Sequence, residues 1–88
     1  MEMMNRVAVI TGGSGGIGKA MAKAFLAEGA KTVVLADLNA EAVSAAAIEI
    51  GCSGKTCDVT DEAQVAALVN ETITEHGKID LFCSNAGA

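Results

Sequence analysis

Apolar residues change their spacing along the chain, and each change marks the boundary of a predicted element. Residues 6–10 form a short β-branched run that ends at Thr-Gly-Gly, which is typical of a buried strand. From Ile17 onwards the apolar period becomes helical, and Gly29 is the expected C-cap of this helix. One face of the helix is therefore predicted to be apolar: Ile17, Ala20, Met21, Ala24 and Phe25.

The next strand–helix unit follows directly. Residues 31–38 predict a second strand, and Asn39 is a good N-cap for the helix after it. Glu41 suits the positive end of that helix, and Gly51 can end it. The predicted inner face of the helix is Val43, Ala46, Ala47 and Ile50.

A third unit and a last strand complete the pattern. Residues 55–59 predict a short strand, Thr60 is the expected N-cap of the next helix, and His76 with Gly77 closes it. Residues 79–87 predict a fourth strand that runs into a turn. The inner face of the third helix is predicted to be Val65, Leu68, Val69, Thr72 and Ile73.

Strands that alternate with single helices, in the order β-α-β-α-β-α-β, predict an α/β fold with a parallel sheet and right-handed crossovers. The 88 residues, 51% of them hydrophobic, suffice for one small domain with a modest core. A net charge of −5 and an aromatic content of 2% argue against a nucleic-acid partner. No stretch resembles a signal peptide or a membrane span, so we expect no membrane partner and a cytoplasmic protein.

The cysteines bear on the same question. Cys52, Cys57 and Cys83 form an odd set without a C-x-x-C pair, which favours reduced thiols in the cytoplasm over a disulfide framework. Cys52 and Cys57 with His76 lack the ligand-pair spacing of a zinc site, so we expect no metal. His76 itself is expected to be a surface residue at a helix end.

The loop between the first strand and the first helix, TGGSGGIGKA, fits more than one phosphate-binding template. A P-loop would need a hydroxyl after Lys19 to bind Mg²⁺, and that position is Ala20. The dinucleotide fingerprint G-x-G-x-x-G fits better, because it follows a strand, opens a helix and precedes Asp37 by about 20 residues. A carboxylate at Asp37 accepts hydrogen bonds from a ribose diol and repels a 2′-phosphate. With Leu38 next to it rather than an arginine, NAD is favoured over NADP.

Three motifs together resemble the short-chain dehydrogenase/reductase family. Residues 11–18 spell T-G-x-x-x-G-x-G, residues 57–60 are CDVT, and residues 84–87 are SNAG. The last motif resembles the family's N-N-A-G element, with Ser84 in the place of its first asparagine. The resemblance extends over residues 6–88. It implies a Rossmann-type sheet with helices on both faces, truncated after the fourth strand, so that residues 1–88 are the amino-terminal portion of an NAD-binding domain.

The resemblance also implies roles for particular residues. The glycine-rich loop would wrap the pyrophosphate and adenosine ribose, the end of the second strand would face that ribose, the CDVT element would flank adenine, and the SNAG element would lie against the ribose. The cofactor-binding residues implied in this way are Gly12, Ser14, Gly15, Gly16, Ile17, Asp37, Leu38, Asp58, Val59, Asn85, Ala86 and Gly87.

Each of these residues also has a purely structural interpretation. Gly15 or Gly18 can serve close packing, Asp58 can be a helix-entry carboxylate, and Asp37 can be a solvated strand end. Asn85 can simply turn the chain. Lys19 and Lys23 are expected on a solvated helix face.

The family's chemistry is hydride transfer between nicotinamide and an alcohol or carbonyl group. The resemblance implies an acid/base tyrosine in a Tyr-x-x-x-Lys pair after the fourth strand, and this chain has no tyrosine. We therefore expect no catalytic residue here, and a longer, homo-oligomeric parent that acts on a small alcohol or ketone. The alternative is a non-catalytic nucleotide-binding module or a non-functional truncation. An open apolar edge on the fourth strand predicts that the isolated chain aggregates or is partly disordered.

Overall fold

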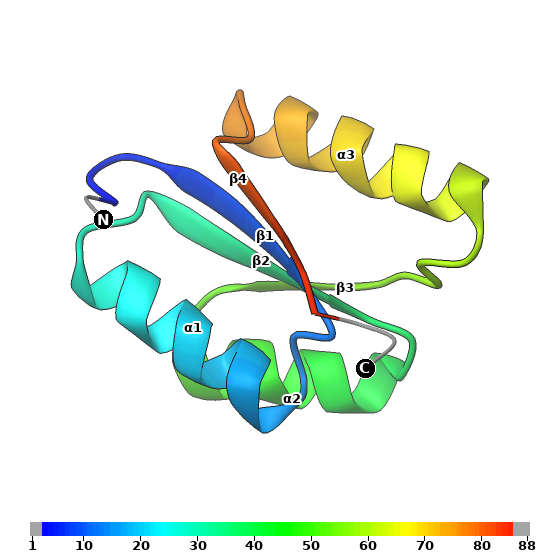
Figure 1. The fold of residues 1–88 in the computed structure, drawn as a ribbon, viewed down its shortest axis with the longest axis horizontal. Helices are drawn as coiled ribbons and strands as arrows, with labels where there is room; N and C mark the ends of the chain where they lie inside the picture. Colours follow the sequence, from blue (N-terminus) through cyan, green and yellow to red (C-terminus); the bar gives the residue numbers. More distant parts are fainter. Residues whose placement is uncertain (1–2, 86–88) are drawn as a thin grey trace.

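A computed structural model of the chain describes residues 3–85. All four strands pair in parallel in one sheet, in the order β3-β2-β1-β4 (Figure 1). Helices α1 and α2 lie on one face of the sheet and α3 lies on the other (Figure 1), so the predicted fold class is confirmed. The elements are β1 Val7–Thr11, α1 Gly16–Ala27, β2 Thr32–Asp37, α2 Ala40–Ile50, β3 Ser53–Thr56, α3 Glu62–His76 and β4 Leu81–Ser84.

The core has two layers, one on each face of the sheet. Alternate residues of β1 and β2 serve the two faces, and all five residues of β1 are buried. The face covered by α1 and α2 contains Met3, Ala8, Ile10, Ala22, Val33, Leu35, Val43 and Ala46. The face covered by α3 contains the smaller cluster Val9, Val34, Ala36, Cys57 and Leu68.

Helix α2 matches its sequence prediction at both ends. The side chain of Asn39 accepts a hydrogen bond from the amide of Ala42, 3.0 Å away, and Gly51 ends the helix with a left-handed φ of 83°. Val43, Ala46 and Ala47 are buried as expected.

The predicted apolar face of α1 is only partly confirmed: Met21 and Phe25 pack against the core, but Ile17, Ala20 and Ala24 are exposed. Ile17 is 70% exposed, whereas Gly18 and Ala22 are buried. The helix is therefore rotated by about one residue, because a glycine at position 18 permits a close approach that a larger side chain would prevent. Glu28 is the C-cap, and Gly29 follows it with a φ of 93°.

The third strand and the start of α3 also differ from prediction. Strand β3 ends at Thr56, and Cys57 follows it with its amide bonded to the Asp37 carbonyl at 2.9 Å. Asp61 rather than Thr60 caps α3, accepting hydrogen bonds from the two amides of Ala63 and Gln64. On the inner face of α3, Leu68 and Thr72 are buried, but Ile73 is exposed.

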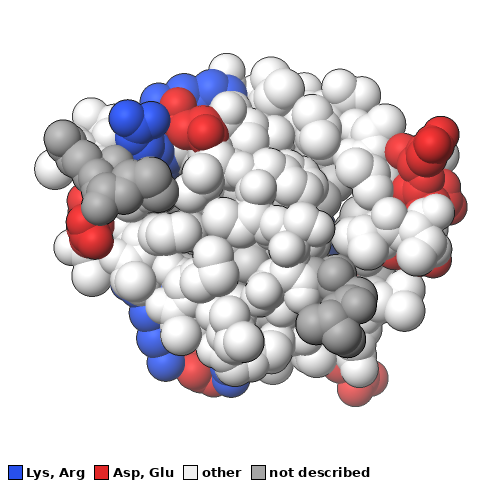
Figure 2. Space-filling view, in the orientation of Figure 1, with Lys and Arg blue, Asp and Glu red and all other residues white. Residues whose placement is uncertain are grey.

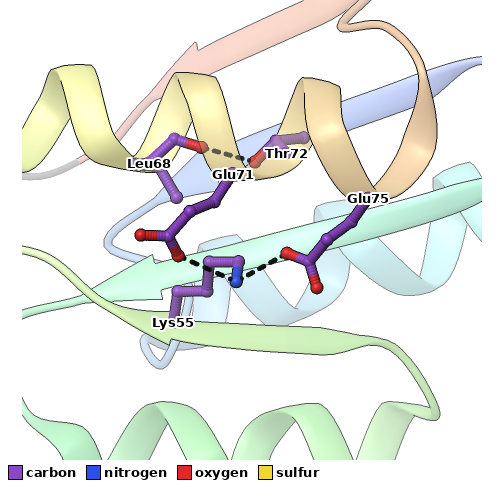
Figure 3. A network of polar contacts seen from close by, with 5 residues as sticks. All are labelled: Lys55, Leu68, Glu71, Thr72 and Glu75. Atoms are coloured by element: carbon purple, nitrogen blue, oxygen red, sulfur yellow. Dashed lines mark hydrogen bonds and ion pairs between the residues drawn. The ribbon is translucent and has the colours of Figure 1, made fainter.

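An ion-pair cluster attaches α3 to the edge strand β3 (Figure 3). The ammonium of Lys55 lies 3.1 Å from the carboxylate of Glu71 and 2.7 Å from that of Glu75, one helical turn further on. The hydrogen bond to Glu75 is the main reason that the pKa of Lys55 is raised, and the same contact lowers the pKa of Glu75. The buried hydroxyl of Thr72 donates to the Leu68 carbonyl at 2.7 Å, so burial of Thr72 does not leave its hydroxyl without a hydrogen-bond partner.

The segment before β1 contributes to the core, which the sequence did not predict. Met3 is only 1% exposed, although Met4 beside it is 58% exposed. A tight turn produces this arrangement: the Arg6 amide donates to the Met3 carbonyl at 3.0 Å, and Asn5 has a left-handed φ of 60°. The amide of Asn5 also donates to the Gly29 carbonyl, which fixes the turn against the end of α1.

Charged side chains lie at the rim of the face seen in Figure 2, and the middle of that face carries none. Strand β4 crosses this middle region in Figure 1, with no strand on its outer side among residues 3–85. Lys19 and Lys23 lie on the surface as expected, and both pair with Glu49 of α2. His76 ends α3, but its ring is half-buried rather than at the surface, with Nε2 unpaired. Within residues 3–85, no helix is long and apolar enough to cross a membrane.

Candidate functional site

The glycine-rich loop lies at the carboxyl end of β1, between that strand and α1. Gly12 has a left-handed φ of 68°, a conformation that favours glycine, and its carbonyl accepts the Gly15 amide at 3.2 Å. The Gly13 amide donates to the Ala36 carbonyl at 3.1 Å, which connects the loop to the end of β2. The loop is thus a closed turn with a defined shape rather than an open linker.

The glycines of this loop fall into two groups according to what an added Cβ would meet. At Gly18 a Cβ would lie 2.7 Å from the Gly12 carbonyl oxygen, and at Gly13 it would lie 2.7 Å from the Cβ of Leu35. Packing alone therefore requires glycine at these two positions. At Gly15 the nearest atom would be 3.5 Å away, and at Gly16 nothing lies within 4 Å. Packing in the fold does not require glycine at these two positions.

The amino terminus of α1 differs from those of the other two helices in its capping. Its N-cap residue, Gly15, makes no side-chain hydrogen bond, and the first turn contains no acidic residue. By contrast, Asn39 and Asp61 cap α2 and α3 with their side chains. The first amide groups of α1, together with the positive end of its dipole, are therefore available to an anion.

Asp37 ends β2 beside this loop, and its carboxylate is held by surrounding donors. Oδ2 accepts hydrogen bonds from both the amide of Ser14, at 3.1 Å, and the Ser14 hydroxyl, and Oδ1 accepts from the Leu38 amide at 2.8 Å. Partial burial by itself would raise the pKa of Asp37, but the hydrogen bonds from Ser14, Leu38 and Asn39 outweigh it and lower the pKa. Asp37 is thus an ionised, oriented acceptor and not merely a solvated strand end.

The loop after β3 brings a second carboxylate to the same edge of the sheet. Oδ1 of Asp58 accepts from the amide of Thr60 at 2.9 Å and from its hydroxyl at 2.6 Å, and the hydroxyl bond is the main reason that the pKa of Asp58 is lowered. The Asp58 amide donates to Oε1 of Gln64 at 2.8 Å. The N-cap of α3 is Asp61, but the hydrogen bonds of Asp58 to Thr60, Asp61 and Gln64 all lie at the entry of α3, so they fit the interpretation of Asp58 as a helix-entry carboxylate.

Three exposed apolar side chains follow these polar groups in the chain. Ile17 is the second residue of α1, Leu38 follows β2 and is 68% exposed, and Val59 follows Asp58 and is 38% exposed. Other apolar side chains away from this edge, such as Ile48 at 80%, are equally exposed, so exposure alone does not distinguish the three.

Thr11 connects the first and last motifs, and sequence reasoning did not assign it a contact. Its hydroxyl donates to the Cys83 carbonyl at 3.3 Å and accepts the Asn85 amide at 3.1 Å. The bond to Asn85 joins the chain after β4 to the chain after β1. Thr11 is the first letter of the T-G motif, which was its only signal in the sequence. Ala86 and Gly87 lie outside the described residues.

The parallel strand order explains why these residues converge. In open α/β sheets the loops at the carboxyl ends of the strands form the ligand-binding crevice. Here Asp37 is the last residue of β2, and the glycine-rich loop, Asp58 and Asn85 follow the ends of β1, β3 and β4 respectively. Ten of the twelve residues predicted from the sequence are described, and all ten lie at this edge or in the first turn of α1.

Beyond the residues of the candidate site, the described chain includes a hollow and three free cysteines. A hollow of about 370 Å³ lies beside the ion-pair cluster, lined by Lys55, Asn70, Glu71, Thr74 and Glu75, away from the glycine-rich loop. Within residues 3–85, no group of three or more His, Cys, Asp or Glu side chains is placed to hold a metal. All three cysteines are free thiols, and burial raises their pKa values.

The fold and the motifs define a class of protein, and comparison with known proteins identifies it. The chain belongs to the short-chain dehydrogenase family, whose family model matches residues 6–88. It is 43% identical to a (+)-cis,cis-nepetalactol synthase of Nepeta racemosa, over 98% of this chain and 33% of that protein. It is 44% identical to a galactitol 2-dehydrogenase of Agrobacterium fabrum, over 98% of this chain and 34% of that protein.

Solved structures agree with this assignment. A short chain dehydrogenase from Mycobacterium smegmatis superposes with a TM-score of 0.90 at 30% identity, covering 98% of this chain and 38% of that one. An NAD⁺-bound xylitol dehydrogenase gives a TM-score of 0.81 at 33% identity, covering 93% of this chain and 33% of that one. The chain spans about a third of the length of the curated relatives it matches.

Proposed function

We propose that this chain binds the pyrophosphate and adenosine half of NAD. The observation that carries the proposal is the pair Gly15 and Gly16 at the start of α1, whose first amides have no side-chain cap. An added Cβ would make only an ordinary contact at Gly15, 3.5 Å from the Gly12 carbonyl oxygen, and would meet nothing within 4 Å at Gly16. Backbone donors that a ligand can approach closely, at the positive end of a helix, suit a pyrophosphate. The family membership of the chain supports the same cofactor class.

The proposed cofactor contacts follow the geometry of the edge. Gly12, Ser14, Gly15, Gly16 and Ile17 form the turn beside the pyrophosphate and adenosine ribose. Asp37 and Leu38 face that ribose, and Asp58 and Val59 flank the adenine. Asn85, with Ala86 and Gly87 after it, lies against the ribose on the side of β4.

The preference for NAD over NADP rests on Asp37. An aspartate is ionised at neutral pH, and the hydrogen bonds that lower the pKa of Asp37 favour the same charged form. The carboxylate would accept hydrogen bonds from a ribose diol and repel a 2′-phosphate. No arginine or lysine lies next to it in sequence to bind such a phosphate, since Leu38 and Asn39 follow it.

The activity of the whole protein is a further part of the proposal. A nicotinamide cofactor, when bound, supplies the site for hydride transfer to or from a carbon atom. We propose that residues 1–88 form the amino-terminal portion of the NAD-binding domain of a cytoplasmic, homo-oligomeric oxidoreductase that acts on a small alcohol or ketone. These 88 residues contain no tyrosine, so the proposal assigns the acid/base role to no residue among them and predicts that they are inactive by themselves.

Gly16→Ala tests the binding proposal. Because an added Cβ meets nothing within 4 Å and φ is not left-handed, the substitution should leave the free energy of unfolding unchanged or raise it by up to about 1 kcal/mol. The same methyl group occupies the space that the pyrophosphate needs, so the affinity for NAD should fall by about tenfold, which is roughly 1.4 kcal/mol.

The measurement is calorimetric titration of the naturally expressed protein with NAD and with NADP. Ser44→Ala, an exposed change on α2, is the matched control and should bind NAD like the unaltered protein. Equal NAD affinity in Gly16→Ala and the unaltered protein would contradict the placement of the pyrophosphate, and a protein that binds neither dinucleotide would refute the proposed function.

A further inference from the structure

Both hydrogen-bond donors of Ser14 bond to the same atom, Oδ2 of Asp37. Its amide and its hydroxyl both donate to Oδ2 of Asp37, and the preceding amide, that of Gly13, donates to the Ala36 carbonyl. Two successive residues of the glycine-rich loop are therefore bonded to two successive residues at the end of β2. Hydrogen bonds thus join the loop to the end of the neighbouring strand. Those from Ser14 are accepted by the Asp37 side chain, and the one from Gly13 is accepted by the backbone of Ala36.

This arrangement changes what Ser14 offers to a phosphate. Its amide is directed at Asp37, so the donors left for an anion are those that begin α1, after Gly15. Their position relative to the loop depends on the turn that holds Gly12 to Gly15. The Ser14 bonds hold the middle of that turn, beside the backbone bonds from Gly13 to Ala36 and from Gly15 to Gly12, so the Asp37 side chain is one of the groups that hold the loop before α1.

We propose that Asp37 is, through Ser14, a positioning residue for the pyrophosphate-binding loop as well as an acceptor for the ribose. The inference rests on the proposed function and adds to it a second role for the same carboxylate. Its consequence is that the affinity for the pyrophosphate group itself depends on Asp37, although that group makes no hydrogen bond to a carboxylate.

The two roles predict opposite signs for one measurement. A carboxylate near an anion site repels the anion, so its removal should strengthen the binding of a phosphate compound that has no ribose. Loss of the hydrogen bonds from Ser14 to Asp37 should weaken the binding of that compound, because the amide groups at the start of α1 are no longer held in place. Inorganic pyrophosphate is the suitable probe, since it carries the charge and lacks the ribose.

The experiment is an NMR titration of the naturally expressed protein with inorganic pyrophosphate, read at the backbone amides of residues 16–18. Asp37→Ala removes both the charge and the acceptor and should weaken pyrophosphate binding at least fivefold. Asp37→Asn removes the charge but keeps one oxygen for Ser14, so it should bind pyrophosphate as well as the unaltered protein or better. Ser14→Ala should weaken binding by a smaller factor because the amide donor remains, and Ser14→Thr, which restores the hydroxyl, should recover it.

The outcomes separate the two proposals. If Asp37→Ala loses NAD affinity but binds pyrophosphate unchanged or more tightly, Asp37 acts on the ribose alone and this inference is overturned while the proposed function stands. An unaltered protein that binds neither NAD nor pyrophosphate would refute the proposed function itself. Should Asp37→Ala fail to fold, the comparison of Ser14→Ala with Ser14→Thr decides, and equal pyrophosphate affinity in those two variants would overturn the inference.

Discussion

Met3 and Met4 are adjacent methionines in opposite environments, and they allow a matched test of the core. Met3 is 1% exposed and packs in the cluster beneath α1 and α2, whereas Met4 is 58% exposed. Replacing a buried methionine by alanine removes its burial energy and leaves a cavity, which costs about 2–5 kcal/mol. A chain of 88 residues has a free energy of unfolding of roughly 4–13 kcal/mol at about 0.05–0.15 kcal/mol per residue. Met3→Ala should thus remove a large share of the total.

The assay is urea unfolding at submicromolar concentration, which limits the association expected at the open edge of β4. With a denaturant slope of about 1–1.5 kcal/mol/M, a loss of only 2 kcal/mol moves the midpoint by roughly 1.3–2 M. Met4→Ala is the control, and its free energy of unfolding should change by no more than about 0.5–1 kcal/mol, since most of its surface already contacts water. Equal shifts for the two variants would refute the reasoning, because they would mean that the segment before β1 is not packed into the core.

Two further predictions concern the loop and the central strand. Gly18→Ala should lower the free energy of unfolding by about 1–3 kcal/mol, measured by the same urea assay, because its Cβ would lie 2.7 Å from the Gly12 carbonyl oxygen; an unchanged midpoint would contradict the close approach. Asp80 accepts the Val7 amide at 2.8 Å, and this bond, followed by that from Lys78, lowers its pKa. The stability that Asp80 contributes is therefore present above about pH 4, the pKa range of an unfolded aspartate, and is lost as the pH falls through the lower pKa of the folded state. Asp80→Asn should flatten the acid limb of stability against pH, and an acid limb identical to that of the unaltered protein would show that the contact is not maintained in solution.

The sequence predicted the element order because local signals were strong and independent of the rest of the fold. Asn39 and Gly51 bracket α2 with an N-cap and a left-handed glycine, and both are local features. The face of α1 was predicted only in part, since Met21 and Phe25 pack against the core as expected and Ile17 does not. A periodicity argument counts Ile17 as inward-facing and ignores Gly18, but the contact between helix and loop is close enough to require the glycine. Here packing distance overrode hydrophobicity.

In the candidate site, too, local sequence patterns predicted some features and the tertiary fold determined the others. The position of Asp37 followed from its spacing after the glycine-rich loop, since both lie in one strand–helix–strand unit. The hydrogen bond between Thr11 and Asn85 joins residues 74 positions apart, so it depends on the parallel pairing of β1 with β4 and no local pattern contains it. The hydrogen bonds from Ser14 to Asp37 could not be predicted either, because spacing predicts which residues are neighbours but not which groups donate hydrogen bonds to which.

The central position of β1 has a consequence for how the chain folds during synthesis. Strand β1 is the first to be made, yet one of its two partners, β4, is the last of the four, and Val7 and Asp80 bond across 73 positions. At about 5–20 residues per second, roughly 4–15 s pass on the ribosome before the second edge of β1 can be covered. During that interval β1, β2 and their helices can collapse against each other while an apolar strand edge stays open. Non-local parallel pairing of this kind is slow to form and prone to association, so the nascent chain should depend on chaperones at this stage more than a chain whose central strand pairs only with its sequence neighbours.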